Sequence, residues 1–323
     1  MVYLLYGEET YLLENYIKKI KKDFGTLQSG INYIKIDNNN INELISDIET
    51  PAFGYDKKLI IARDTNLFKK DGRKKVQQNQ ELVDKITKYL EDNTKIVNEF
   101  VELVFVEQEV NKNSLYSIIE KIGQIKNFEE LKLPQIITNI KSICKSYNVN
   151  IDEVTAKYFV ECCGTNMQDI INEIRKLIEY VGEKGNITKE SIDLLCIRKL
   201  DSVIFDLTDN LGKKNITEAL TVLSNLIYSK EPIQKILITL YNHFKKLYLV
   251  KLSEKYNKNL AESLGLKPNQ MFLTSKYKAQ ASCFKESDLR NIVEELINLD
   301  SNYKIGKIDL NIGLESILCR YCS

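Results

Sequence analysis

The sequence has only one histidine among its 323 residues. Histidine is the commonest general base of enzymes, so the chain offers a single candidate for that role. His243 lies in a segment where Leu240, Phe244 and Leu247 recur at helical spacing. That position is typical of a half-buried histidine that packs within a helix bundle. We therefore expect no histidine-based catalytic triad.

A strong net charge is also missing. Lys and Arg number 46 and Asp and Glu number 45, which gives a formal net charge of +1. Proteins that act on nucleic acid alone usually carry a strong positive field. DNA as the sole target is therefore not expected, and any contact with DNA should be local. The 43% hydrophobic and 28% charged residues are ordinary for a soluble globular protein of two or three domains.

Long apolar runs are absent as well. No run approaches the roughly 20 residues needed to span a bilayer. The N-terminal stretch MVYLLYGEE turns acidic too early for a signal peptide. We expect a cytoplasmic protein with no membrane partner.

Groups of metal ligands are not apparent in the sequence. Seven cysteines, an odd number in a long chain, favour reduced thiols over a disulfide framework. Cys162 and Cys163 are adjacent, and Cys319 and Cys322 form a lone C-x-x-C pair. A zinc site needs about four ligands, and no second pair or neighbouring histidine accompanies this one. The sequence predicts no metal site and no cofactor.

The first third of the chain alternates between short apolar segments and segments of helical period. The strand candidates are Val2–Tyr6, Tyr33–Ile36, Leu59–Ala62 and Val101–Val106. This order predicts an α/β domain in which helices flank a parallel sheet. The polar run Lys69–Gln80 is typical of a solvated loop.

The turn after the first strand has the place of a P-loop but not its residues. A P-loop carries G-x-x-x-x-G-K-[ST], whose main-chain N–H groups and lysine hold phosphates. Here the turn is Gly7, Glu8, Glu9 and Thr10, with no second glycine and no lysine. After the last strand candidate, Glu107 is followed by glutamine where an active ATPase would place an Asp-Glu pair. The sequence predicts a degenerate P-loop that does not bind nucleotide.

From Leu133 onward every strong segment has helical period. Thr165 and Gln168 are spaced as a capping box, and Thr188 is placed to cap a later helix. The longest helical segments of the last third are Val203–Leu211, Ala219–Ile227, Ile233–Tyr256, Leu289–Leu299 and Ile308–Cys319. We predict three domains: an α/β domain at 1–133, a small helical lid or spacer at 134–200, and a helical domain at 201–323.

One connection in the first domain contains an unusual apolar segment, formed by Pro51, Ala52 and Phe53. A short helix is expected over Ile41–Ile48 with Asn40 as its N-cap, and Pro51 should end that helix near Thr50. Phe53 then lies between this helix and the next strand. It is either a core residue folded under the sheet or an exposed anchor for a partner, because loops on a rigid scaffold often carry binding residues.

Several stretches, taken in order, resemble the bacterial DNA polymerase III delta subunits, the clamp-opening subunits of replicative clamp loaders. They are LLYGEETYLLENYI, TPAFGYDKKLII, GTNMQDIINEIRKLIEYVG with ITKESI, SVIFDLTDNLGKKNITEALTVLSNL, EPIQKILITLYNHFKKLY and NLDSNYKIGKIDLNIGLESIL. The resemblance runs nearly end to end. It implies an AAA+ like domain without ATPase motifs, a helical lid domain, and a helical collar domain that assembles with other loader subunits.

The resemblance also implies a function and a site. A delta subunit binds the sliding clamp, the beta subunit, and opens its ring for loading on primed DNA during replication. The implied clamp-binding element is Thr50, Pro51, Ala52 and Phe53, although the family commonly has a second large apolar residue where this chain has Ala52. The other implied partners are the gamma or tau and delta prime subunits, with primed DNA reached through the complex. The chain itself would be non-catalytic, with ATP acting in neighbouring subunits.

Two other classes of function stay in view. An active AAA+ ATPase would need phosphate and magnesium ligands, which the Gly7–Leu12 turn and the segment after Val106 lack. A helical scaffold or DNA-binding protein of replication would rest on clusters of lysine. These are the Lys69–Lys75 run and the face formed by Lys245, Lys246, Lys251 and Lys255. The near-zero net charge disfavours this last class.

Overall fold

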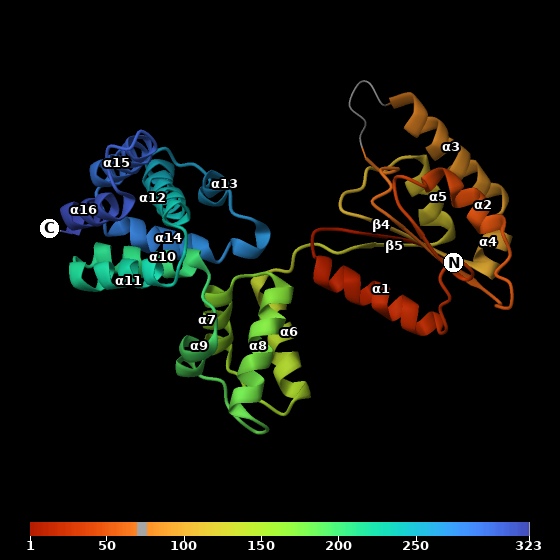
Figure 1. Cartoon of the computed structure of the whole chain (residues 1–323), viewed down its shortest axis with the longest axis horizontal. Coiled ribbons are helices and arrows are strands. Elements are labelled where there is room, and N and C mark those ends of the chain that lie inside the picture. The colour runs from red at the N-terminus through yellow and green to blue at the C-terminus, as the bar shows by residue number, and fades with distance from the viewer. Residues whose placement is uncertain (70–75, 323) are drawn as a thin grey trace. The chain divides into compact units, whose positions relative to one another are not determined.

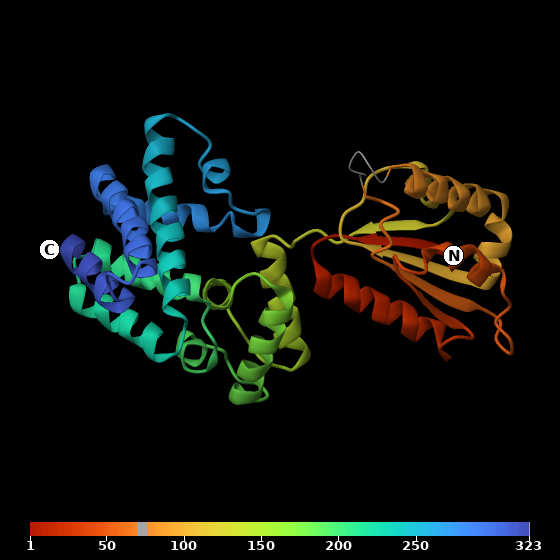
Figure 2. The same cartoon turned by 45° about the horizontal axis from the view of Figure 1, so that its top comes forward.

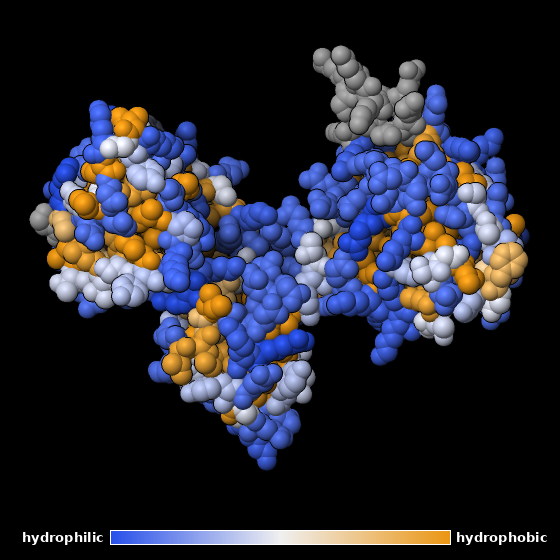
Figure 3. All heavy atoms as spheres, in the orientation of Figure 1, coloured by the Kyte–Doolittle hydropathy of each residue, from blue (hydrophilic) through white to orange (hydrophobic). Residues whose placement is uncertain are grey.

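The computed structural model describes residues 1–69 and 76–322. The chain forms two compact units, Met1–Glu130 and Leu131–Ser323, here called the N-terminal and C-terminal units (Figure 1). The three-domain division at residues 133 and 200 remains a prediction. Hydrophilic side chains cover most of the face seen in Figure 3. Within the described ranges, no helix is both long enough and apolar enough to cross a membrane.

A five-stranded parallel sheet organises the N-terminal unit, in the order β2-β3-β4-β1-β5. The strands are β1 (Val2–Tyr6), β2 (Tyr33–Ile36), β3 (Lys58–Arg63), β4 (Val101–Glu107) and β5 (Gln124–Asn127). The predicted fold class, an α/β domain followed by helices, is confirmed. The edge strand β5 was not predicted, because its sequence QIKN is polar and largely exposed and so gives no apolar signal.

Helices cover both faces of this sheet (Figure 2). Helix α1 (Thr10–Phe24) packs on one face through Leu13, Ile17 and Ile20, which join a cluster with Leu59 and Val104. The opposite face is covered by α2 (Leu44–Glu49), α3 (Val76–Asp92), α4 (Thr94–Phe100) and α5 (Ser114–Ile122). Burial on both faces explains why β3 and β4 are almost continuously apolar.

Two local predictions in the N-terminal unit need correction. Asn40 does not cap a helix with its side chain. Its Oδ1 instead accepts from the main-chain N–H of Asp37, and a 3₁₀ turn (Ile41–Glu43) precedes α2. The predicted loop Lys69–Gln80 ends earlier than expected, since α3 already begins at Val76. The residues Asp71, Gly72, Arg73, Lys74 and Lys75 of that run lie outside the described residues.

The C-terminal unit begins with α6 (Leu133–Ser146), α7 (Glu153–Cys163), α8 (Met167–Val181) and α9 (Lys189–Leu195). Thr188 caps α9 as predicted, because its hydroxyl accepts from the N–H of Ser191. The predicted capping box of Thr165 and Gln168 is wrong. The N-cap of α8 is Asn166, whose side chain accepts from the N–H of Asp169.

The remaining helices share one apolar core. They are α10 (Leu200–Gly212), α11 (Ile216–Tyr228), α12 (Ile233–Lys255), α13 (Leu260–Leu264), α14 (Leu273–Ser282), α15 (Glu286–Lys304) and α16 (Leu310–Cys322), with a 3₁₀ turn at Pro268–Gln270. Helices α13 and α14 were not predicted, because α13 has five residues and α14 has few apolar positions.

His243 packs within α12 as predicted but is fully buried rather than half-buried. The side-chain N–H group of Gln280 donates to Phe205 and Asp209, which leaves the Gln280 oxygen to accept from His243 Nε2 at 2.8 Å. This arrangement places the proton of the neutral imidazole on Nε2. Burial lowers the pKa of His243 to about 4.

Candidate functional site

The connection between α2 and β3 begins with a main-chain carbonyl that the helix cannot satisfy. In an α-helix the carbonyl oxygen of Asp47 would accept from the N–H of residue 51. Residue 51 is proline and has no N–H to donate. The ammonium of Lys58 supplies the missing donor, with its Nζ 2.7 Å from the Asp47 oxygen and 2.5 Å from the Thr50 oxygen.

Lys58 ties the end of α2 to the start of β3. Its side chain is buried, and burial lowers its pKa, while the nearby Asp47 carboxylate opposes that decrease. A cation at the carboxyl end of a helix also interacts favourably with the helix dipole. The connection is therefore fixed at both ends, by the helix that precedes it and by the central sheet that follows it.

Between these ends the chain makes a tight turn that carries Phe53. The N–H of Tyr55 donates to the carbonyl oxygen of Ala52 at 2.8 Å, and Gly54 has φ +83°, a conformation that glycine adopts without strain. Phe53 is 75% exposed, more than any other large hydrophobic residue described in the N-terminal unit. A core position for Phe53 is thus excluded. Aromatic side chains presented by a connection on a rigid scaffold are a common form of interface anchor.

The other residues of the predicted element lie on the same short segment. Thr50 ends α2 as predicted, with its N–H and hydroxyl both donating to the carbonyl oxygen of Ser46. Thr50 and Pro51 are exposed, and Ala52 is half-buried. Lys58 was missed by sequence reasoning. The available signal was a lysine directly before an apolar strand, seven residues after a proline that removes a helix donor.

The glycine turn after β1 is closed by the chain's own backbone. The main chain of Phe128, just after β5, crosses it so closely that a Cβ on Gly7 would lie 2.2 Å from the Phe128 carbonyl oxygen. That oxygen accepts from the N–H of Glu9 at 2.9 Å, and the N–H of Phe128 donates to Tyr6. A main-chain N–H group near the start of α1 is therefore already engaged within the protein.

Glu9 occupies the position before α1 where a P-loop would hold a phosphate. It is the N-cap residue of α1 and is buried. Burial raises the pKa of its carboxyl group, and nearby main-chain N–H groups of Tyr11 and Leu12 oppose this increase. A carboxylate here competes with a phosphate for the positive end of the helix dipole. Thr10 is exposed and begins the helix.

Glu107, which follows β4 where an active ATPase would place its magnesium-binding pair, bonds a neighbouring turn. Its Oε1 accepts from both the N–H of Thr65, at 2.9 Å, and the Thr65 hydroxyl, at 2.6 Å. These bonds hold the turn after β3, in which Asp64 and Asn66 have positive φ. Burial raises the pKa of Glu107, and its Oε2 has no hydrogen-bond partner among the described residues.

The sheet keeps the two candidate regions apart. Gly7 and Glu107 lie at the carboxyl ends of β1 and β4, whereas the Phe53 turn leads into the amino end of β3. Because these strands are parallel, one region lies at the carboxyl ends of the strands and the other lies at their amino ends. The structure therefore groups Thr50, Pro51, Ala52 and Phe53 but does not bring them near the degenerate P-loop.

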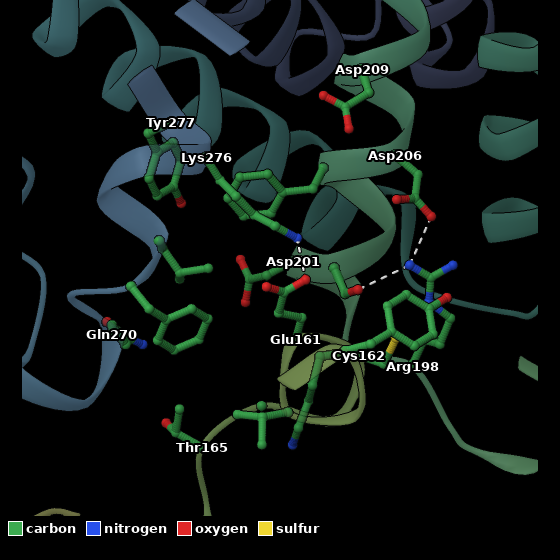
Figure 4. Close-up of a pocket in the computed structure, with 18 of the residues that line it drawn as sticks. Glu161, Cys162, Thr165, Arg198, Asp201, Asp206, Asp209, Gln270, Lys276 and Tyr277 are labelled. Atoms are coloured by element: carbon green, nitrogen blue, oxygen red, sulfur yellow. Dashed lines mark hydrogen bonds and ion pairs between the residues drawn. The ribbon is translucent and has the colours of Figure 1, made fainter. Parts of the chain in front are cut away.

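A pocket of about 380 Å³ lies in the C-terminal unit between α7, α10 and α14 (Figure 4). Four of its charged side chains form two ion pairs. Lys276 lies 2.6 Å from Glu161, and Arg198 lies 2.7 Å from Asp206. The first pair joins α14 to α7, so the predicted lid and helical domains are in contact. We assign this pocket a structural role.

Comparisons with known proteins agree along the chain. A family model described as DNA polymerase III, delta subunit, matches residues 3–104, and one described as DNA polymerase III delta subunit, C-terminal domain, matches residues 201–321. The DNA polymerase III subunit delta of Bacillus subtilis (strain 168) is 26% identical over 98% of this chain and 91% of the relative. A probable DNA polymerase III subunit delta of Aquifex aeolicus (strain VF5) is 28% identical over 94% and 86%, respectively.

A solved structure shows the same fold. The Bacillus subtilis DNA clamp loader delta protein superposes with a TM-score of 0.72 at 24% identity, covering 99% of this chain and 95% of that one. Both family models and both relatives thus name one subunit, and the matches run from the first strand to the last helix. The chain belongs to the DNA polymerase III delta subunit family.

Proposed function

We propose that this clamp-loader subunit binds a sliding clamp through Phe53 and opens the clamp ring. The observation that carries the proposal is the 75% exposure of Phe53 on a turn that Lys58 fastens to the sheet. Anchor residues of interfaces are commonly aromatic side chains held on a rigid support, where they enter a pocket of the partner.

A rigid anchor can open a ring through binding energy alone. A ligand shifts a closed ring toward the open form only by its higher affinity for the open form. Helix α2 and strand β3 hold the two ends of the Phe53 turn, so the turn resists adapting to the closed ring. The clamp then has to change its conformation to make the contact. The higher affinity of the Phe53 turn for the open ring supplies the free energy of opening.

Thr50, Pro51 and Ala52 complete the proposed contact surface. Ala52 presents less apolar area than the larger residue common in the family, and each Å² of buried apolar area contributes about 25 cal/mol. We therefore expect Phe53 to carry most of the affinity. Ala52→Leu should increase the affinity for the clamp if position 52 faces the clamp. An unchanged affinity would mean that Phe53 alone acts as the anchor.

ATP hydrolysis belongs, in this proposal, to neighbouring subunits of the loader, and this chain is non-catalytic. The main-chain closure at Gly7 and the buried carboxyl group of Glu9 support this assignment. The same two features disfavour the active-ATPase alternative. Titration calorimetry with ATP tests the assignment: micromolar affinity that is lost on changing the Gly7 turn would contradict it.

Helices α10–α16 are proposed to form the collar that joins this subunit to the gamma or tau and delta prime subunits in the cytoplasm. The shared apolar core of these helices supports a folded domain of their own at 201–323. Primed DNA would be reached through the assembled complex. The near-zero net charge of the chain supports this indirect route and disfavours a separate DNA-binding scaffold.

The direct test of ring opening uses the purified chain and the sliding clamp of the same organism, without nucleotide. A fluorophore pair across one clamp interface reports the separation of the two faces. The proposal predicts binding and a loss of energy transfer on adding the chain. No binding, or binding with the interface still closed, would contradict it.

A further inference from the structure

Two thiols and a carboxylate meet where α7, α8 and α9 come together in the C-terminal unit. Cys163 is the last residue of α7, Glu173 lies within α8, and Cys196 directly follows α9. The two sulfur atoms and a Glu173 carboxylate oxygen all lie within 4.8 Å of one another. Cys163 is buried, while Glu173 and Cys196 are partly exposed. No other such group of three occurs among the residues that the structure describes.

The protein backbone already holds these three side chains in place. The N–H of Cys196 donates to the carbonyl oxygen of Ile192 and ends α9. The next N–H, of Ile197, donates to Glu173 Oε2 at 3.0 Å. The Glu173 carboxylate is therefore bound to the same short segment that carries Cys196. The cluster is formed by residues from three helices, and neither the clamp contact nor the degenerate P-loop uses it.

The donor set matches a borderline-soft divalent ion. Zinc is bound by cysteine sulfur at about 2.3 Å and by carboxylate oxygen at about 2.0 to 2.2 Å. Ligand atoms on one tetrahedral ion therefore lie roughly 3.5 to 4 Å apart, whereas the atoms of this cluster lie within 4.8 Å, so their separations have to shorten by at most about 1.3 Å. Exposure on the Cys196 side leaves room for water as a fourth ligand.

We propose that Cys163, Glu173 and Cys196 bind a zinc-class divalent ion that fastens α7, α8 and α9 together. The two S–H bonds break as two sulfur–metal bonds form, and both protons pass to the solvent without any change of oxidation state. Lys176, whose Nζ lies 2.6 Å from Glu173 Oε2, competes with the ion for that carboxylate. The site should therefore bind less tightly than a four-cysteine zinc site.

A bound ion would also fix the path from α9 to α10. The N–H of Lys199 donates to the carbonyl oxygen of Cys162, next to the proposed ligand Cys163. The segment from Cys196 to Lys199 is then held at both ends, by the ion and by this bond. Because the ion binds the folded state, it should raise the melting temperature of the C-terminal unit.

The test uses the full chain, reduced and freed of metal by a chelator, with Co²⁺ as a spectroscopic probe. One equivalent of Co²⁺ should produce a thiolate-to-cobalt charge-transfer band and the strong visible bands of a tetrahedral site. One equivalent of Zn²⁺ should remove both. A chain that shows no such bands under reducing conditions would overturn the proposal.

Single substitutions identify the ligands. Cys196→Ser should weaken Co²⁺ binding by more than about tenfold and remove part of the charge-transfer band. Glu173→Gln should weaken binding without removing that band, which arises from sulfur. Cys319→Ser and Cys283→Ser change exposed cysteines outside the cluster and should have no effect. A charge-transfer band and a Co²⁺ affinity that are both unchanged in Cys196→Ser, or bands that vanish in Cys319→Ser, would contradict the proposed site.

Discussion

The Lys58 ammonium donates to the main-chain oxygen of Asp47 at 2.7 Å and takes the place of the N–H that Pro51 lacks. A proline that ends a helix thus leaves an acceptor, and a buried lysine from the following strand satisfies it. The same ammonium bonds the Thr50 oxygen. The Phe53 turn is therefore attached to the sheet by a side chain that need not touch a partner itself.

Lys58→Met should loosen this attachment. The variant keeps the apolar stem but leaves two carbonyl oxygens without their donor, which should cost about 1 to 3 kcal/mol of stability. Clamp binding should weaken as well, by less than in Phe53→Ala, because the turn is no longer fixed. Melting curves and clamp titrations measure the two effects. Lys57→Met is the matched control, since Lys57 is exposed, and equal behaviour of the two variants would exclude the positioning role.

Gly7→Ala should destabilise the N-terminal unit strongly. A Cβ there would lie 2.2 Å from the Phe128 oxygen, and the φ of +131° is itself unfavourable for alanine. We expect a loss of about 3 kcal/mol or more, from overpacking and backbone strain together. Gly25 also has positive φ, at +93°, but a Cβ there would contact nothing within 4 Å. Gly25→Ala should therefore cost only about 1 to 2 kcal/mol in a urea melt, and a similar cost for both variants would contradict closure of the turn by Phe128.

Stability should depend on pH through His243. Its folded pKa of about 4 lies below the ordinary value of 6.5, so the unfolded chain binds a proton more readily. The stabilisation is fully present above pH 6.5 and is lost as the pH falls toward 4, by about 3 kcal/mol in all. Urea melts of the full chain at several pH values measure the slope. His243→Gln should flatten it between pH 6.5 and 5, and an unchanged slope would contradict the assignment.

Much of the fold could be predicted from sequence because its strands are buried on both faces. Runs such as Leu59–Ala62 are continuously apolar for that reason, and Pro51 marked the end of α2 correctly. Strand β5 could not be predicted, since an exposed edge strand is stabilised by its hydrogen bonds to β1 and not by burial. The N-cap of α8 is Asn166, and not Thr165 as predicted from the sequence. Adjacent polar residues can serve equally well as N-caps, and packing in the folded chain decides which one does.

The position of the candidate site could be predicted from the sequence, but the exposure and the contacts of its residues could not. Phe53 could be placed on a connection, yet its exposure depends on how the turn at Gly54 directs the chain. The contact of Lys58 with two carbonyl oxygens, and the meeting of Cys163 with Cys196, join residues that only the folded chain brings together. For Lys58 the sequence offers only its place between Pro51 and an apolar strand, and for the two cysteines, 33 residues apart, it offers no signal.

Phe53→Ala tests the central claim, that Phe53 anchors the clamp. An exposed anchor can be truncated with little effect on folding, so the melting temperature should stay nearly unchanged. Clamp affinity should fall by about thirtyfold or more, which corresponds to roughly 2 kcal/mol, the size expected of an interface hot spot. Phe100→Ala is the control, because Phe100 is an exposed aromatic residue of the same unit, at the end of α4.

The decisive measurement is a titration of the sliding clamp with wild-type chain, Phe53→Ala and Phe100→Ala under identical conditions without nucleotide. The account predicts that Phe100→Ala binds like the wild type and that Phe53→Ala alone loses affinity while remaining folded. A folded Phe53→Ala chain that binds the clamp with wild-type affinity would contradict it.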